Sequence, residues 1–190
     1  MTSRGKLVRA AVVGAGVVAL ISACNSGGDS KHGGESAPAT SSVAADVPAG
    51  FNACQLPQSV IQSESLERSD VDTQDGAGGT KWRGCIWVQS SGNGYSATID
   101  STNITLPMIR ANGDFKVGNE LTVSGRPALT YAQPSQDLHT HCIMSIEIKG
   151  GGLEISVNNP PSARDTASQH SCDIAQRLAE GIIPSIPSGL

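Results

Sequence analysis

The clearest pattern in the chain is a strict alternation of apolar and polar positions over residues 142–149. The apolar residues of this segment share one side of a strand: Cys142, Met144, Ile146 and Ile148. A run of glycines, Gly150 to Gly152, then leads into residues 153–158, which alternate in the same way. Because successive side chains of a strand point to opposite faces, both runs predict strands with one buried face, joined as a hairpin.

Two further strand pairs are predicted upstream, where short apolar and β-branched runs flank turn residues. In the first pair, strands over residues 84–88 and 95–99 flank a turn at residues 91–94. In the second pair, strands over residues 120–123 and 128–132 flank a turn at residues 124–127. Residues 69–80 are acidic and rich in glycine, and they are predicted to form a solvated loop.

Helical patterns lie at both ends of the predicted folded domain, residues 51–190. Residues 56–61 predict a short helix, and residues 106–113 predict a second one. The C-terminal segment has an apolar face at helical spacing, with Ser171 as the predicted N-cap and Pro184 at its end. Strands between terminal helices predict an α+β fold, in which an N-terminal and a C-terminal helix pack on an antiparallel sheet.

The N-terminal residues follow a different pattern. Three basic residues (Arg4, Lys6 and Arg9) precede twelve uninterrupted apolar residues, 10–21. A membrane-spanning helix needs about 20 such residues, so this order is typical of a secretory signal peptide. The segment ends in Ile21-Ser22-Ala23-Cys24, which resembles the bacterial lipobox, in which the cysteine thiol is lipidated and the chain is then cut before it.

We therefore expect residues 1–23 to be a lipoprotein signal peptide and Cys24 to carry lipid. The alternative is an ordinary secretory signal followed by a chance cysteine. Residues 24–50 are rich in glycine, serine, alanine and threonine, and they predict a flexible linker. Two or three acyl chains, at about 0.8 kcal/mol per buried CH₂, would hold the protein permanently at the extracytoplasmic face of the cell membrane.

Composition and charge narrow the choice of partners. The 190 residues are 38% hydrophobic, which fits one domain with a tail and excludes a wholly disordered chain. The formal net charge is -4, and three of the 13 basic residues lie in the predicted signal peptide. The remainder is therefore distinctly acidic and has no basic cluster, so we expect no nucleic-acid partner.

Four cysteines remain besides Cys24: Cys54, Cys85, Cys142 and Cys172. An even number in an exported domain indicates two disulfides, because the envelope is oxidising. Three connectivities are possible, and sequence order and local pattern favour Cys54–Cys85 with Cys142–Cys172. In the second pair, a strand and a helix each present the cysteine on the inward face. The alternative, a metal site or a redox pair, lacks the usual C-x-x-C spacing.

Five short motifs occur in a fixed order along the domain. They are Cys54-Gln55-Leu56, Cys85-x-Trp87, Gly125-Arg126-Pro127-Ala128, Cys142 within its strand, and Cys172-Asp173-Ile174-Ala175. Together they resemble the actinobacterial lipoprotein family called domain of unknown function 3558, which includes mycobacterial Lpr- and Lpp-type lipoproteins. One departure is His170-Ser171, where the family has Asp-Pro. The resemblance implies an envelope location, the disulfide pairing above and a Mog1/PsbP-like sandwich, and it supplies no catalytic residue.

Two groups of residues are candidate metal sites. His139 and His141 are expected on the same side of a strand, a spacing that metal sites use, and His170 is a candidate third ligand. The plainer interpretation is that they are polar residues at a strand entrance. The acidic run that begins at Asp70 superficially resembles a calcium loop, but Lys81 stands where a bidentate glutamate is needed.

No catalytic motif is present in the sequence: there is no G-x-S-x-G, and the glycines of residues 76–79 lack the lysine of a phosphate loop. Trp82 is a candidate for flanking a groove, whereas Trp87 shares a face with Cys85 and is predicted to lie in the core. We therefore expect a binding or accessory module without enzymatic activity or a cofactor, whose ligand is a protein or a lipid. The alternatives are an envelope hydrolase, a metal-binding protein, or a lipid or glycolipid carrier.

Overall fold

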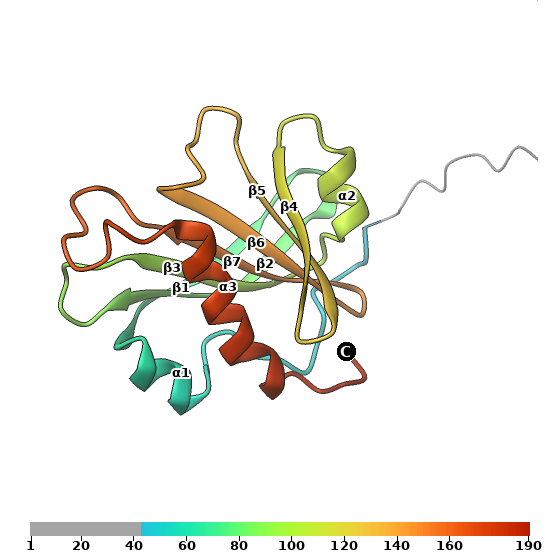
Figure 1. The fold of residues 1–190 in the computed structure, drawn as a ribbon. Helices are drawn as coiled ribbons and strands as arrows, with labels where there is room; N and C mark the ends of the chain where they lie inside the picture. Colours follow the sequence, from blue (N-terminus) through green and yellow to red (C-terminus); the bar gives the residue numbers. More distant parts are fainter. Residues whose placement is uncertain (1–42) are drawn as a thin grey trace, which may run out of the picture. The chain divides into compact units, whose positions relative to one another are not determined.

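The computed structural model describes residues 43–190, so the predicted signal peptide, Cys24 and most of the predicted linker (24–50) lie outside the described residues. Its centre is one seven-stranded sheet with the order β1-β2-β3-β7-β6-β5-β4 (Figure 1). The strands are β1 (Leu66–Asp75), β2 (Lys81–Gln89), β3 (Ser96–Thr102), β4 (Lys116–Val123), β5 (Arg126–Ala132), β6 (His141–Ile148) and β7 (Gly151–Asn158). Every neighbouring pair is antiparallel, which confirms the predicted α+β class.

Three α-helices and two 3-10 turns accompany the sheet. They are α1 (Gln58–Ser63), α2 (Leu106–Ala111), α3 (Ser171–Ile182), η1 (Ala77–Gly79) and η2 (Ile183–Ser185). Helix α3 lies across β6 and β7, with α1 beside it (Figure 1). Within residues 43–190, no helix combines the length and the apolar character needed to cross a bilayer.

The main core lies between the sheet and α3. Ile174, Leu178 and Ile182 of α3 are fully buried against the apolar face of the strands. Trp87 on β2 belongs to this core, as predicted, and its indole Nε1 donates a hydrogen bond of 3.1 Å to the carbonyl oxygen of Ala53. We call this side of the sheet the covered face.

A smaller core lies on the opposite side of the sheet, which we call the open face. There Leu106 and Ile109 of α2 pack against Leu129 and Tyr131 of β5. Helix α2 is only six residues long, so it covers part of this face and leaves the rest to side chains of the strands themselves.

The two disulfides have the favoured connectivity. Cys54 and Cys85 join the segment before α1 to β2, and Cys142 and Cys172 join β6 to the first turn of α3. Each closes a loop of about 30 residues, for which a stabilisation of about 2–4 kcal/mol is typical.

The prediction of a loop over residues 69–80 is wrong for its first half, because β1 pairs with β2 from Leu66 to Asp75. β1 is an edge strand, and almost all of its side chains are exposed. Its strand conformation therefore depends on main-chain pairing rather than on an apolar face, and the sequence shows no apolar alternation there. A register shift between Arg68 and Asp70 adds a bulge, a common device for protecting an edge.

The N-cap of α3 is His170 rather than the predicted Ser171. The His170 Nδ1 atom accepts a hydrogen bond of 3.3 Å from the backbone N–H of Cys172. Ser171 is buried, and its hydroxyl donates instead to the carbonyl oxygen of His139 at 2.9 Å. Because α3 already begins at Ser171, the capping position falls on the residue before it, His170.

Candidate functional site

A row of residues crosses the open face at right angles to the strands. Asp72 on β1 lies opposite Gly84 on β2, Gly84 lies opposite Asp100 on β3, and Asp100 lies opposite Glu154 on β7. Opposed residues of an antiparallel sheet place their side chains on the same face. Three carboxyl groups from three strands are therefore collected on one face, and the next strand continues the row with Ser145.

Gly84 makes room for the carboxyl group of Asp100. A Cβ atom at position 84 would collide with Asp100 Oδ1 and with the backbone of Ile99. A side chain at position 84 would therefore displace Asp100 or spread β2 from β3. The close approach explains why a strand interior contains a glycine here, where a side chain would otherwise favour the strand.

The row borders a hollow of about 280 Å³. Its lining includes three acidic and three aromatic residues, namely Asp72, Asp100, Glu154, Trp82, Phe115 and Tyr131. The rings of Phe115 and Tyr131 contact each other in a tilted arrangement, with their centroids 4.8 Å apart. The hollow is thus small, acidic and partly walled by aromatic rings.

Glu154 is buried and held by two hydrogen bonds. Its Oε2 accepts from the Tyr131 hydroxyl at 2.7 Å, and its Oε1 accepts from the Trp82 indole N–H at 3.2 Å. Burial raises the pKa of Glu154, and the two donors offset part of that effect because they favour the ionised form. Burial likewise raises the pKa of Tyr131, so its hydroxyl stays protonated and donates.

Asp100 is more deeply buried, at 3% exposure, and its Oδ1 has no hydrogen-bond partner within residues 43–190. Burial, followed by the negative charges of Asp72 and Glu154, raises the pKa of Asp100 to about 8. Its carboxyl group therefore carries a proton over much of the neutral range. A buried polar atom without a partner costs about 1–3 kcal/mol, and buried acids with strongly shifted pKa values cluster at functional sites.

The arrangement offers a ligand both hydrogen-bonding groups and an exchangeable proton. A protonated Asp100 beside Glu154 can donate and accept hydrogen bonds and can exchange a proton with a ligand. No histidine is among the residues that line the hollow. Within residues 43–190, no three or more His, Cys, Asp or Glu side chains are grouped as a metal ion requires.

The histidines lie in a different arrangement from the predicted one, in which His139 and His141 share the side of a strand. His139 precedes β6 instead of lying in it, so His139 and His141 do not share the side of a strand. The ring of His139 instead contacts the ring of His170 edge-on, with the centroids 5.0 Å apart. His141 is half-buried, and burial lowers its pKa.

Sequence reasoning identified one wall of the hollow and missed its centre. Trp82, the candidate for flanking a groove, does line it, and Asp72 comes from the segment that was predicted to be a loop. Asp100 and Glu154 were missed because an acid between apolar neighbours of a strand is expected to face solvent. The one signal in the sequence was Gly84 inside a strongly apolar strand, which indicates a close approach.

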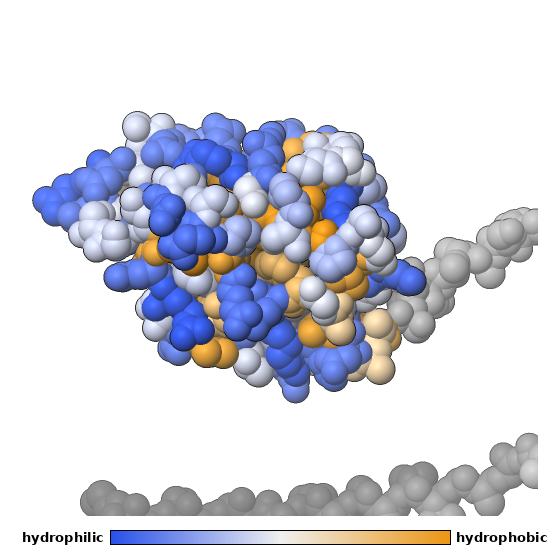
Figure 2. All heavy atoms as spheres, turned by 90° about the horizontal axis from the view of Figure 1, so that it is seen from below, coloured by the Kyte–Doolittle hydropathy of each residue, from blue (hydrophilic) through white to orange (hydrophobic). Residues whose placement is uncertain are grey.

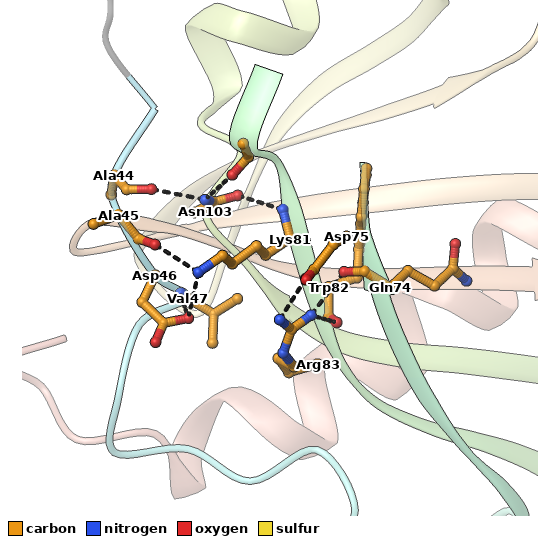
Figure 3. Close-up of polar contacts among 11 residues, drawn as sticks. Ala44, Ala45, Asp46, Val47, Gln74, Asp75, Lys81, Trp82, Arg83 and Asn103 are labelled. Atoms are coloured by element: carbon orange, nitrogen blue, oxygen red, sulfur yellow. Dashed lines mark hydrogen bonds and ion pairs between the residues drawn. The ribbon is translucent and has the colours of Figure 1, made fainter. Parts of the chain in front are cut away.

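The chain enters the domain beside the start of β2, where Lys81 and Asn103 bind residues 44 and 45 (Figure 3). Asn103 is fully buried, and its Nδ2 donates to the carbonyl oxygens of Ala44 at 2.8 Å and Gly79 at 2.9 Å. Its Oδ1 accepts from the backbone N–H of Lys81 at 2.8 Å. One side chain thus attaches the entering chain to two segments of the sheet edge.

Lys81 adds a second attachment at the same place. Its Nζ donates to the carbonyl oxygen of Ala45 at 2.7 Å and lies 3.6 Å from the Asp46 carboxylate (Figure 3). The backbone N–H of Val47 donates to that carboxylate at 2.9 Å. These contacts fix residues 44–47, which lie within the predicted linker (24–50).

Comparison with known proteins identifies one family. The sequence profile of a family described as "Protein of unknown function (DUF3558)" matches residues 19–185. No curated protein and no solved structure gives a significant match. The Mog1/PsbP-like arrangement that the resemblance implies therefore stays a prediction.

Proposed function

The chain belongs to the DUF3558 family of proteins of unknown function, and from this premise we propose that it is a lipid-anchored binding protein of the cell envelope. Lipid on Cys24 holds it at the outer face of the plasma membrane. The hollow on the open face of the sheet binds a small ligand.

Two observations support the anchoring part of this proposal. Basic residues, a short apolar stretch and a lipobox-like sequence occur in the order that export and lipidation require, and the family match over residues 19–185 includes Cys24. Both pairs of cysteines in the domain form disulfides, which persist in oxidising compartments and are rare in the cytosol.

The binding part rests on one observation, the carboxyl group of Asp100. It is 97% buried, borders a hollow of about 280 Å³ and has an oxygen without a partner in the described part of the chain. A stable fold normally pairs such an atom or places it on the surface. Because Asp100 lines the hollow, a ligand there that offers a hydrogen-bond donor would bind to its carboxyl group.

The described surface favours a small polar ligand over a long acyl chain. Hydrophobic residues on the face shown in Figure 2 are interspersed with hydrophilic ones. Within residues 43–190, Val71 is the one large hydrophobic side chain that is clearly exposed. A carrier of lipid tails would need a continuous apolar cavity.

Fractionation of cells tests the anchor. We expect the full chain to sediment with membranes and to partition into detergent, and the variant Cys24→Ser to be released or to accumulate as the uncut precursor. Ser26→Ala is the matched control, because it changes a neighbouring residue and leaves the thiol intact. Membrane association of mature Cys24→Ser protein, equal to that of the control, would contradict the anchor.

Ligand-observed NMR with the full chain in detergent tests the hollow. We expect a mixture of small polar compounds to contain binders that are lost in Thr98→Trp, because Thr98 lines the hollow and a larger side chain fills it. Thr122→Trp, on an exposed position of β4, should retain them. Binders that are retained equally by both variants would place the ligand elsewhere.

A further inference from the structure

We propose that the ligand of the hollow is an organic cation whose ammonium group binds between Asp100 and Glu154, with its carbon skeleton against Trp82. This inference rests on the proposed function, since it names the ligand class of the same site.

The charge of the lining is the first argument. Asp72, Asp100 and Glu154 contribute three carboxyl groups, and none of the residues that line the hollow is a lysine, arginine or histidine. Ionised groups that are removed from water without a partner are strongly destabilising. When these carboxyl groups are ionised the hollow lacks positive charge, so a cation is favoured over an anion.

The hydrogen bonds of the two central carboxyl groups are the second argument. Glu154 is oriented by Tyr131 and Trp82, whereas the Oδ1 of Asp100 accepts no hydrogen bond from the described residues. An ammonium group has three N–H donors and no acceptor, which matches a site of carboxylate oxygens. Charge-assisted hydrogen bonds of this kind are roughly twice as strong as neutral ones.

The aromatic wall is the third argument, and it favours an organic cation over a metal ion. The indole of Trp82 is fixed by its hydrogen bond to Glu154, and Phe115 and Tyr131 stand beside it. Aromatic faces attract ammonium groups and the CH₂ groups next to them. A bare metal ion makes no use of such rings, and no grouping of metal-ligating side chains is found in residues 43–190.

The inference carries a definite pH dependence. Asp100 faces Asp72 from β1 and Glu154 from β7, while β2 contributes only Gly84, and these surroundings raise its pKa to about 8. A cation binds best to the ionised carboxyl group, so binding must release the proton of Asp100. Affinity should therefore rise as the pH rises to about 8, until the amine itself loses its proton at about pH 10.

Fluorescence titration of the full chain in detergent tests the ligand class. Of the two tryptophans, Trp87 is buried in the covered-face core, so a change on ligand addition reports Trp82. The probes are benzylammonium, benzyl alcohol and benzoate, which share a ring and differ in charge. We expect benzylammonium to bind about tenfold more tightly than the alcohol, benzoate not to bind, and the affinity for benzylammonium to rise between about pH 6 and pH 8.5.

Asp100→Asn should lose about tenfold in affinity for benzylammonium and lose the pH dependence, because the amide carries neither charge nor a titrating proton. Asp173→Asn is the matched control, since Asp173 is exposed on α3 over the other face. Glu154→Gln provides a second test at the partner carboxyl group, and thermal unfolding confirms that each variant is folded.

Two results would overturn the inference and leave the proposed function standing. Benzyl alcohol or calcium chloride could change Trp82 fluorescence as strongly as benzylammonium does, or Asp100→Asn could bind benzylammonium as well as the control. If the mixture used to test the hollow also yields no compound that Thr98→Trp excludes, the proposed function itself fails.

Discussion

Asp100 on β3 and Glu154 on β7 are direct cross-strand partners, and both oxygens of Glu154 accept hydrogen bonds, whereas the Oδ1 of Asp100 has no partner among the described residues. The two carboxyl groups are both buried, and their ionised forms repel each other at close range. One of them is stabilised by Tyr131 and Trp82, while the other keeps its proton. On this asymmetry rests our proposal that the open face binds a cation.

The pH dependence of stability follows from Asp100. Burial raises its pKa from 3.8 to about 8, so between these values the folded protein holds a proton that the unfolded chain has lost. The free energy of unfolding should therefore fall as the pH rises from about 4 to 8, by an amount on the order of a few kcal/mol.

Urea unfolding of wild type and Asp100→Asn at several pH values tests this pH dependence of the free energy of unfolding. The variant should be the more stable of the two near pH 8, and its stability should vary less with pH. Parallel profiles for the two proteins would show that Asp100 titrates as an ordinary exposed aspartate.

The disulfide between Cys142 and Cys172 should contribute about 2–4 kcal/mol to stability, because it closes a loop of about 30 residues between β6 and α3. Cys142→Ala with Cys172→Ala should lower the midpoint of chemical unfolding accordingly, and reducing agent should then affect the double variant less than the wild type. Alkylation of the unreduced, denatured wild-type domain should label none of its four cysteines; labelling of any of them would contradict the pairing.

Asn103 should be essential for holding the entering chain. Asn103→Ala removes three hydrogen bonds, to Ala44, Gly79 and Lys81, and should destabilise the domain by about 1–3 kcal/mol. Limited proteolysis should then cut near residue 44 faster than in wild type. Asn119→Ala, at an exposed position of β4, is the control. Equal cleavage rates in the two variants would show that Asn103 does not hold the chain.

Glu64, the residue after α1, contacts Arg177 of α3 and Tyr95, the residue before β3. Its carboxylate accepts from Arg177 Nε at 2.6 Å and from the Tyr95 hydroxyl at 2.8 Å. Burial alone would raise the pKa of Glu64, but these donors outweigh it and lower the pKa below 4.5. The stabilisation is therefore present above about pH 4.5 and is lost as the pH falls through the lowered value.

Glu64→Gln should accordingly destabilise the protein near neutral pH by about 1.5–3 kcal/mol, the usual range for hydrogen bonds to a charged group. The difference from wild type should shrink in acid. Glu120→Gln removes the carboxylate of an exposed ion pair with Arg110 and should have a much smaller effect. A similar loss in both variants would show that burial adds nothing at Glu64.

The sequence predicts those parts of the fold in which local pattern and burial agree. The alternation over residues 142–149 predicted β6, and the helical spacing of apolar residues from Ile174 to Ile182 predicted α3. Sequence order and local pattern favoured the observed connectivity of the four cysteines, and for Cys142 and Cys172 the inward faces of a strand and a helix supported it. In each case, the apolar residues that define the pattern are the ones that the structure buries.

The rest depends on pairing between distant segments. β1 has Leu66 and Val71 as its apolar residues, and an edge strand needs no apolar face to pair with β2. Asp100 and Glu154 are 54 positions apart, and only the sheet order places β3 beside β7. No local pattern in the sequence shows that these two strands are adjacent, so the centre of the candidate site could not be predicted from the sequence.

The central claim is that the carboxyl group of Asp100 binds the ligand of the hollow. NMR titration of the Asp100 carboxyl carbon in the full chain tests this claim most directly. The account predicts a pKa of about 8 in the free protein and a marked fall when benzylammonium is bound. A pKa close to 3.8 in the free protein, unchanged by the probe, would contradict it.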